Sequence, residues 1–557
     1  MESKELKVDA HQVLRLLEGD FDSSAEEKPL VSQDDQSFLD ILRSEINQDE
    51  EGFYEIPLPF KSSKPHLPNN RTQALHRFNS LGSKLAKDTH LYSLYKEFMT
   101  GLIQSGEAEL VSTPDHGSKE CWYLPHHGVF NPNCPGKLRV VFDGSCKFGG
   151  HSLNRYLLQG PDLNNTLVGV LTRFRQDRIA ISCDIAKMFH QFKVSKSHRD
   201  YLRFLWFHPE QNDQVAEYRM TVHVFGATSS PGCAKFDLLQ LASDHEHTSP
   251  SAAAFSKNNF YVDDGIVNCA TADEAMQLLE ETRGVCAKGN LRLYKLLSNS
   301  LEVLESFPRE EWNPNLKEIS CFDSQSVVER MLGLRWCMSS DQFSFQFTSQ
   351  LHQTTRRGIL SVLASIFDPL GFLSPILLRG RLILQHMTNS LDWDTPLPAE
   401  IELKWNQWLE EMNVHSAVHV NRCFLPDDFR ECVRAEVHVF ADACEHGYGA
   451  CCYLRMIDCE GNIHCSFLFS KARVVPLKKR ITIPRLELQA AVLAARIGCK
   501  MQMELSFPSQ LFLCSDSTIV LDYISNSAKR FHVFVSNRVS SIWEMTNVDQ
   551  WHHVPGN

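Results

Sequence analysis

Two strand-like runs of apolar residues end in aspartates whose spacing could support metal-ion chemistry. The first run closes at Asp184, and the second, residues 260–265, carries Asp263 and Asp264 next to each other. Adjacent acids at a strand turn repel each other unless a cation compensates their charge. Three carboxylates from two neighbouring strands would suit two Mg²⁺ ions, which prefer hard oxygen ligands and also bind substrate phosphates. The alternative is an ordinary turn, because Asp-Gly is a common hairpin signal.

A second set of acids lies near the end of the chain. Asp442 ends the strand-like residues 437–442, Glu487 lies just inside a helix that begins with proline, and Asp516 ends a later strand-like run. This order resembles the ribonuclease H fold, in which such carboxylates bind two Mg²⁺ that activate water against a phosphodiester. Taken singly, each acid could equally be a solvated strand end or an acid at a helix N-terminus.

The elements that would position these acids can be predicted from the periodicity of the apolar residues. From Asn70 to about Gly106 these residues recur at three- and four-residue steps, which predicts helical structure that ends at a glycine. Short β-rich runs follow, interrupted by helical patterns at residues 167–174 and 272–284. We therefore expect an α+β domain with an antiparallel sheet, and a second β-rich module from about Glu436.

The charge of the chain is organised by segment. The 557 residues carry a net charge of −12, which by itself disfavours a nucleic-acid partner. Residues 1–60, however, hold 5 basic and 16 acidic side chains, whereas residues 61–210 hold 20 basic and 12 acidic ones. We interpret this as an acidic leader, flexible or with short helices around residues 13–17 and 38–46, ahead of a basic module. The total charge therefore no longer argues against nucleic acid.

Composition excludes several other classes of protein. Hydrophobic residues make up 43% and charged residues 22% of the chain, which is typical of globular proteins of several domains. Its 18 cysteines form no CxxC pair and follow no apolar leader, which favours reduced thiols in an intracellular protein. The weakly charged stretch at residues 358–378 contains Asp368-Pro369, so we expect a packed segment rather than a membrane span.

Several motifs together resemble the Pol polyprotein of BEL/Pao-type LTR retrotransposons, a reverse transcriptase followed by an RNase H-like domain. Residues 261–264 (YVDD) resemble the catalytic box of reverse transcriptases, and residues 184–189 (DIAKMF) resemble its first acidic motif. Residues 225–231 (FGATSSP) resemble the motif that supports the template and the incoming nucleotide. Residues 137–143 and 331–336 resemble the fingers strand and the primer grip. These motifs occur in the order that the family shows.

The resemblance implies a fold and a division into domains. The expected fold is α+β, with reverse-transcriptase fingers, palm and thumb followed by an α/β RNase H-like domain. The expected parts are an acidic leader at 1–60, a reverse transcriptase at 61–345, a largely helical thumb or connection at 346–435, and an RNase H-like domain at 436–557.

The resemblance also implies roles for single residues. Asp184, Asp263 and Asp264 would hold one pair of Mg²⁺ ions, or Mn²⁺ in their place, and Asp442, Glu487 and Asp516 a second pair. Phe189 would reject the 2′-hydroxyl of a ribonucleotide by its bulk. The remaining nucleotide-binding residues would be Arg139, which clamps the triphosphate, and Phe225, Gly226 and Lys295. The hybrid backbone would contact Lys478, Lys479 and Arg480.

Two departures from the family pattern stand beside this assignment. Phe225 replaces the glutamine that many retroviral enzymes have before the glycine of the middle motif, so hydrogen bonding to the nucleotide cannot be transferred. The family pattern also continues past residues 551–557 into an Asn-Pro-Ala-Asp that supplies a fourth acid, which this sequence does not contain.

The predicted function is thus RNA-directed DNA synthesis with an RNase H-like activity. The expected partners are an RNA template, a DNA primer, RNA–DNA hybrid and dNTPs, with no membrane and no oligomeric state indicated. The expected location is the cytoplasm, in retroelement particles, and the nucleus. The alternative is a decayed or co-opted remnant that binds nucleic acid or protein without turnover.

Overall fold

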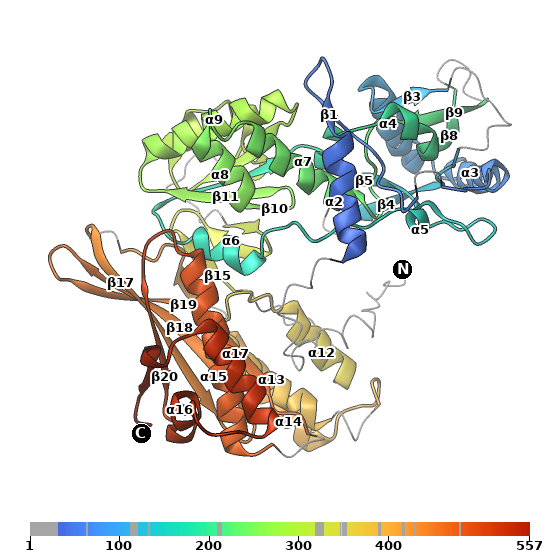
Figure 1. Cartoon of the computed structure of the whole chain (residues 1–557). Coiled ribbons are helices and arrows are strands. Elements are labelled where there is room, and N and C mark those ends of the chain that lie inside the picture. Colours follow the sequence, from blue (N-terminus) through green and yellow to red (C-terminus); the bar gives the residue numbers. More distant parts are fainter. Residues whose placement is uncertain are drawn as a thin grey trace.

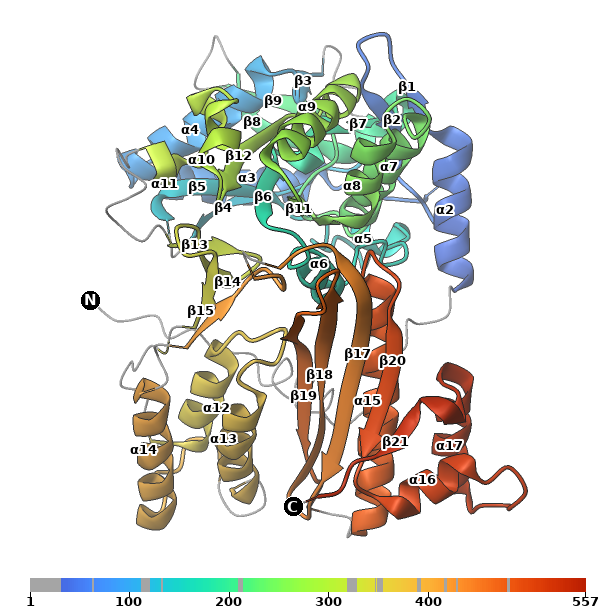
Figure 2. The ribbon, with the colours of Figure 1, turned by 90° about the vertical axis from the view of Figure 1, so that its left-hand side faces the viewer.

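The structure is a computed structural model, and the parts of the chain that it describes form an upper and a lower half (Figure 1). The described residues are 32–62, 65–111, 121–131, 134–208, 214–317, 328–345, 347, 354–387, 392–414, 418–426, 429–477 and 481–556. In Figure 2 the first sheets and their helices lie at the top, and a long five-stranded sheet lies below them.

The fingers-like part of the upper half is built around one buried aromatic core. Its helices and strands are α3 (Arg71–Leu85), α4 (Thr89–Gln104), β3 (Ala108–Leu110), β4 (His126–Asn131), β5 (Cys134–Phe142), β8 (Arg203–Phe207) and β9 (Val215–Met220). β3, β9 and β8 form one sheet, and β4 and β5 form a hairpin. The helical periodicity predicted from Asn70 to Gly106 is confirmed as two helices, and Gly106 follows α4 with a φ of 74°.

The palm-like part contains the predicted antiparallel sheet. The strand order is β10 (Phe260–Tyr261), β11 (Asp264–Cys269), β6 (Ile179–Ile185) and β12 (Leu293–Ser298), and all neighbours are antiparallel. The helices of this part are α6 (Leu167–Arg173), α7 (Ser230–Asp244), α8 (Pro250–Asn258) and α9 (Ala272–Lys288). The short helices α5 (Leu153–Tyr156), α10 (Leu301–Glu305) and α11 (Pro314–Lys317) lie in the connecting segments. Apolar residues of the sheet and of α7, α8 and α9 share one buried core.

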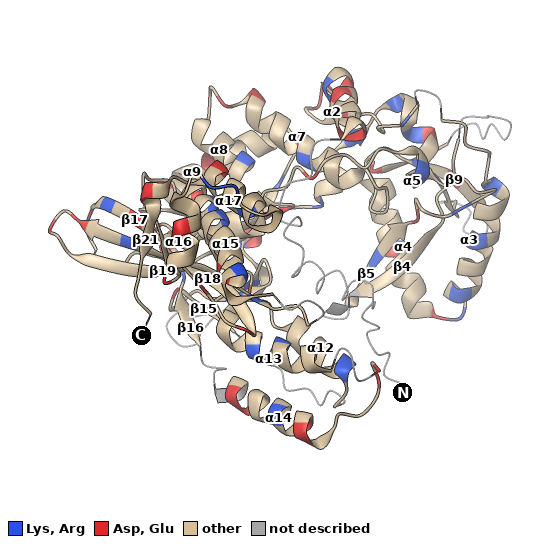
Figure 3. Cartoon of the chain, turned by 60° about the horizontal axis from the view of Figure 1, so that its bottom comes forward, with Lys and Arg blue, Asp and Glu red and all other residues tan. Residues whose placement is uncertain are grey.

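Residues 33–56 of the leader are not flexible, and a helix lies where the alternative placed one around residues 38–46, whereas residues 13–17 lie outside the described residues. Residues 33–56 form α2 (Gln33–Glu45), β1 (Asn47–Gln48) and β2 (Tyr54–Ile56). Phe38 and Leu42 of α2 are fully buried in the palm core. A side chain in place of Gly160 or Gly232 would collide with the ring of Phe38. Figure 1 shows α2 beside α7, and the red segments of α2 in Figure 3 mark its acidic residues.

The predicted boundary after residue 345 runs through a continuous sheet. This sheet consists of β13 (Val328–Met331), β14 (Leu334–Cys337), β15 (Gln342–Ser344) and β16 (His419–Asn421). β15 pairs directly with β16, across the helical segment between them. That segment contains α12 (Arg356–Ser365), α13 (Ser374–His386) and α14 (Ala399–Val414), in agreement with its predicted helical character. Asp368, between α12 and α13, accepts hydrogen bonds from two backbone amides.

The lower half has the topology of an RNase H-like domain. Its elements are β17 (Cys432–Ala443), β18 (Gly447–Asp458), β19 (Ile463–Val474), α15 (Ile483–Glu504), β20 (Gln510–Ser515), α16 (Thr518–Ser525), α17 (Val533–Met545) and β21 (Trp551–His553). The strand order is β19-β18-β17-β20-β21, with β20 parallel to both of its neighbours. β17 begins at Cys432, ahead of the predicted start of this module at residue 436.

Candidate functional site

The palm sheet brings the first three predicted acids to one end of two neighbouring strands. Asp184 on β6 lies opposite Asp264 on β11 in the antiparallel register. In such pairs the Cβ atoms are about 5 Å apart. Asp263 lies in the tight turn between β10 and β11, and its carbonyl oxygen accepts a hydrogen bond of 3.0 Å from the amide of Ile185. The strand ends therefore position all three residues together.

The turn that carries Asp263 differs from the predicted Asp-Asp-Gly turn. Its two central residues are Val262 and Asp263, because Tyr261 pairs with Asp264. Val262 has a φ of 58°, in the left-handed region where such turns ordinarily have glycine. A β-branched residue there costs of order 1–3 kcal/mol and persists only where the surrounding structure fixes it.

Lys295, which was predicted to bind the nucleotide, forms an ion pair with Asp184. Its Nζ is 2.5 Å from Oδ2 of Asp184, and 39% of its side chain is exposed. Lys295 has a φ of 54° and lies at an irregularity of β12, where the register shifts between Tyr294 and Leu297. Partial burial opposes its charge, but hydrogen bonds to Asp184 and Tyr294 raise the pKa of Lys295 above its ordinary value.

The three aspartates remain short of positive charge. Burial and the negative charges of Asp263 and Asp184 raise the pKa of Asp264 to about 6, against the opposing effect of Lys295. Three carboxylates at one edge are donors of the kind that Mg²⁺ prefers, so their chemistry fits the ion. As they stand, however, no three His, Cys, Asp or Glu side chains within the described part of the chain are close enough to hold a metal. One visible reason is that Asp184 is turned toward Lys295.

Three of the predicted nucleotide-binding residues contact one another. The rings of Phe189 and Phe225 meet edge to face, with centroids 4.5 Å apart. The guanidinium of Arg139, an exposed residue on β5, lies 5.8 Å from the centroid of Phe225. Phe225 thus contacts both other residues through its ring, which gives a structural role to the residue that replaces glutamine.

Asn154 holds the turn that contains Phe225 and was not predicted as a site residue. Its Nδ2 donates to the carbonyl oxygen of Gly226 at 2.9 Å, and its Oδ1 accepts from the amide of Thr228 at 3.0 Å. Gly226 has a φ of 113°, and a Cβ there would lie 1.9 Å from the carbonyl oxygen of Phe142. Neither periodicity nor a strand end pointed to Asn154, because both of its hydrogen bonds reach a turn that lies more than 70 residues away along the chain.

The second set of acids also gathers at one end of a sheet. Ala441 pairs with Ser515 in the parallel strands β17 and β20, so Asp442 and Asp516 follow side by side. Parallel strands end at the same edge of a sheet, and both aspartates are exposed there. Glu487 on α15 accepts a hydrogen bond of 2.5 Å from Oγ of Ser517, the residue after Asp516.

The residues expected to contact the hybrid backbone, Lys478, Lys479 and Arg480, lie outside the described residues. Elsewhere, the blue segments of α3 in Figure 3 mark basic residues along this helix of the fingers. This agrees with the excess of basic residues found in residues 61–210.

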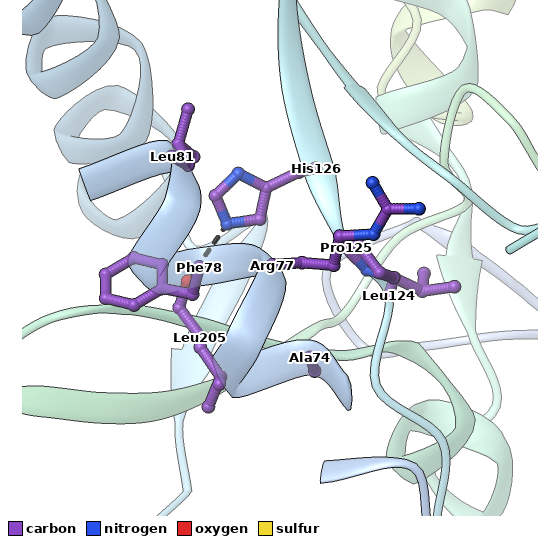
Figure 4. Close-up of a pocket in the computed structure, with 8 residues that line it drawn as sticks. All are labelled: Ala74, Arg77, Phe78, Leu81, Leu124, Pro125, His126 and Leu205. Carbon is purple, nitrogen blue, oxygen red and sulfur yellow. Dashed lines mark hydrogen bonds between the residues drawn. The ribbon is translucent and has the colours of Figure 1, made fainter. Parts of the chain in front are cut away.

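Two hollows within the described part of the chain lie in the fingers, away from both sets of acids. A groove of about 370 Å³ lies in the fingers, where α3, α4 and β4 meet, and none of the predicted site residues lines it. A small hollow next to it is drawn in Figure 4, where His126 bonds to the carbonyl oxygen of Leu205 at 2.9 Å. Burial lowers the pKa of His126 to about 4, so this side chain is neutral. None of the helices in the described ranges is both long and apolar enough to cross a membrane.

Comparison with known protein families supports the resemblance to a BEL/Pao-type Pol fragment. Residues 355–517 match the model of the Pao retrotransposon-like RNaseH-like domain. This range includes Asp442, Glu487 and Asp516 of the second acid set. No curated protein matches the chain in sequence.

Comparison with solved structures confirms the predicted fold class. One similar structure is a foamy viral protease-reverse transcriptase in complex with RNA/DNA hybrid, at 12% identity and a TM-score of 0.53. The match covers 99% of this chain and 63% of that one, so the chain spans less than two thirds of that relative. A second structure is the dRH form of that protein with ds DNA, at 13% identity, a TM-score of 0.53, and 100% and 83% coverage. A third, the protein with dsDNA, has 12% identity, a TM-score of 0.53, and 99% and 98% coverage.

Proposed function

We propose that this chain, with its reverse-transcriptase fold and Pao-type RNaseH-like domain, is an RNA-directed DNA polymerase of a retrotransposon. It would extend a DNA primer on an RNA template with dNTPs. The observation that carries the proposal is the register that sets Asp184 opposite Asp264, beside the turn of Asp263 and within a few residues of Phe189. An ordinary turn needs no third acid on the neighbouring strand.

Asp184, Asp263 and Asp264 would hold two divalent ions in this proposal. Mg²⁺ bound there would favour ionisation of the primer 3′-hydroxyl and would neutralise the triphosphate. Arg139 would bind phosphate oxygens, to which its planar guanidinium is suited. Phe189, braced by Phe225, would lie under the sugar and exclude a 2′-hydroxyl. These are the same residues that the sequence motifs indicated.

The RNase H-like domain would act on the RNA strand of RNA–DNA hybrids. Asp442, Glu487 and Asp516 would supply carboxylates for a second pair of ions, and the hydrogen bond from Ser517 orients one carboxylate oxygen of Glu487. Lys478, Lys479 and Arg480 would bind backbone phosphates in a sequence-independent way.

Replacing Lys295 with methionine tests whether this lysine is the resident counter-ion of the aspartates. Without a divalent ion, the variant is expected to lose about 1 kcal/mol of stability, because the ammonium that bonds to Asp184 is removed while the three carboxylates remain. Added Mg²⁺ should then stabilise the variant more than the parent, since no ammonium competes for Asp184. The measurement is the thermal unfolding midpoint in EDTA and across a Mg²⁺ titration.

The matched control is Lys193→Met, because Lys193 pairs with Asp49 at 2.6 Å away from the three aspartates. It should lower the midpoint without changing the response to Mg²⁺. Equal responses of both variants to Mg²⁺ would contradict the counter-ion role of Lys295.

Replacing Phe189 with alanine tests its role at the sugar. Removal of the ring is expected to raise incorporation of rNTPs relative to dNTPs by roughly 10- to 200-fold, the range that loss of steric exclusion in an apolar pocket produces. The measurement is single-nucleotide incorporation with matched dNTP and rNTP titrations. A ratio equal to that of the parent would exclude Phe189 as the discriminating group.

Primer extension and primer–template binding, measured on the same protein samples, separate the enzyme from a binding remnant. The polymerase proposal expects a DNA primer annealed to RNA to be both bound and extended with dNTPs and Mg²⁺. Binding without extension would favour the remnant, and the absence of both would leave neither reading supported.

A further inference from the structure

The short segment that carries Phe189 needs an anchor. Phe189 lies in η1, a 3₁₀ helix over Met188–Gln191, and the residue before it, Lys187, has a φ of 48°. A single 3₁₀ turn has few hydrogen bonds of its own, so the orientation of its side chains depends on what it contacts. The question is which group of the fold holds η1 in place.

Glu107 makes two hydrogen bonds on either side of Phe189, one to the residue before η1 and one within η1. Its Oε1 accepts a hydrogen bond from Nζ of Lys187 at 2.7 Å, and its Oε2 accepts one from Nδ1 of His190 at 2.6 Å. Only 11% of the Glu107 side chain and 8% of the His190 side chain are exposed. The buried carboxylate of Glu107 therefore holds Lys187 and His190, one on each side of Phe189. We call these two hydrogen bonds the Glu107 bracket.

The backbone around Glu107 is hydrogen-bonded to β9 and to the residue that follows it. The amide of Thr221 donates to the carbonyl oxygen of Glu107 at 3.0 Å, and the Thr221 hydroxyl donates to the carbonyl oxygen of Gly106 at 2.7 Å. The next residue, Ala108, begins β3 and pairs with Met220 on β9. Glu107 is thus bonded to Thr221, the residue that follows β9 and precedes Phe225 by four positions.

The charge of Glu107 persists although the residue is buried. Burial alone would raise its pKa, but the hydrogen bonds and charges of His190 and Lys187 hold the pKa of this carboxyl at about 2. Hydrogen bonds to an ionised acceptor are shorter and roughly twice as strong as neutral ones. The hydrogen bonds of the Glu107 bracket, to Lys187 and His190, are therefore strong at neutral pH.

The bracket also reaches the ring that packs against Phe189. The His190 ring lies 5.9 Å from the Phe225 ring, which in turn lies 4.5 Å from the Phe189 ring. A shift of His190 would therefore displace both aromatic rings. No other contact of Glu107 is needed to explain why an acid lies at this place.

We propose that Glu107 is a positioning residue that fixes Phe189 and so sets the discrimination between dNTPs and rNTPs. This inference rests on the proposed function and extends it from Phe189 to the fingers. Glu107 acts through η1 and touches neither nucleotide nor metal. Replacing Glu107 should change the ratio of kcat/KM for dNTPs to kcat/KM for rNTPs, and not only the overall activity.

The test is single-nucleotide incorporation with dNTP and rNTP titrations for Glu107→Ala, Glu107→Gln, Phe189→Ala and the double variant Glu107→Ala/Phe189→Ala. Each variant is scored by the dNTP-to-rNTP ratio of kcat/KM, in which any fraction of unfolded protein cancels. Glu107→Ala should lower this ratio about tenfold. Glu107→Gln should stay within roughly threefold of the parent, because an amide can bond to both Lys187 and the other tautomer of His190.

The double variant should have the same ratio as Phe189→Ala alone, because groups that act through one contact are not additive. The matched control is Glu55→Ala, since Glu55 pairs with Arg199 at 3.2 Å with 14% exposure and, within the described residues, forms no ion pair with η1. Its ratio should equal that of the parent.

Two outcomes would overturn the inference, and they can be told apart. If the parent adds dNTPs but Glu107→Ala slows dNTP and rNTP addition by the same factor, Glu107 is only a structural residue. If the parent adds no nucleotide at all, the proposed function fails and this inference fails with it.

Discussion

Replacing Arg422 with methionine is expected to destabilise the chain by ~3–5 kcal/mol, the usual cost of breaking a buried ion pair by removing one partner. Arg422 is fully buried where the palm, the β13–β16 sheet and the RNase H-like domain meet. Its Nε and Nη2 bond to the two carboxylate oxygens of Asp341, each at 2.7 Å. Loss of the guanidinium would leave Asp341 without its bidentate partner.

The same guanidinium satisfies three backbone carbonyls of the loop that precedes β6. These are the oxygens of Phe174, Asp177 and Arg178, at 2.6, 2.9 and 2.7 Å. With the two bonds to Asp341, all five donors of the side chain are used. Methionine fills similar space but restores none of these bonds, and each buried carbonyl left unpaired adds to the cost.

Urea unfolding followed by tryptophan fluorescence measures the effect, because Nε1 of the buried Trp336 donates to Asp341 at 2.9 Å. The matched control is Arg357→Met, which removes an equally bidentate but exposed pair with Asp394. That change should cost no more than about 1 kcal/mol. Similar losses of unfolding free energy in both variants would contradict the stabilising role of the buried Arg422 contacts.

Replacing both Asp263 and Asp264 with asparagine is expected to reduce dNTP addition by roughly a thousandfold or more, because two of the three proposed metal ligands lose their charge. The fold should survive, since asparagine has nearly the same shape and the raised pKa of Asp264 shows that its charge is unfavourable where it lies. Binding of primer–template should be retained. The measurement is the single-turnover rate, with binding followed in parallel.

The matched control for the charge change is Glu280→Gln/Glu281→Gln, an adjacent acid pair on α9 of the same palm. It should leave the rate within about twofold of the parent, because surface substitutions of this kind have small effects. Incorporation that is unaffected by the Asp263/Asp264 change would exclude the palm aspartates as the catalytic site.

Both acid sets could be predicted because their aspartates lie where runs of apolar residues end or turn, and because Glu487 lies just inside a helix that begins with proline. The antiparallel pairing of Asp184 with Asp264 and the parallel ends at Asp442 and Asp516 follow from those strand ends. The identity of the fold came from the resemblance of motifs, and the family and structure comparisons agree with it.

Long-range packing was beyond the reach of sequence patterns. The burial of Phe38 depends on glycines more than a hundred residues away, so the packing of α2 into the palm core could not be predicted from the acidic segment. The hydrogen bonds of Arg422 and those of Glu107 also join segments that are distant in the sequence. The contact of Lys295 with Asp184 depends on a β12 irregularity that no periodicity indicates.

Extension of a DNA primer on an RNA template by the unaltered chain tests the central claim most directly. With dNTPs and Mg²⁺ the proposal predicts template-directed addition that stops in EDTA and resumes when Mg²⁺ is restored. A protein that binds the primer–template but adds no nucleotide under these conditions would contradict it.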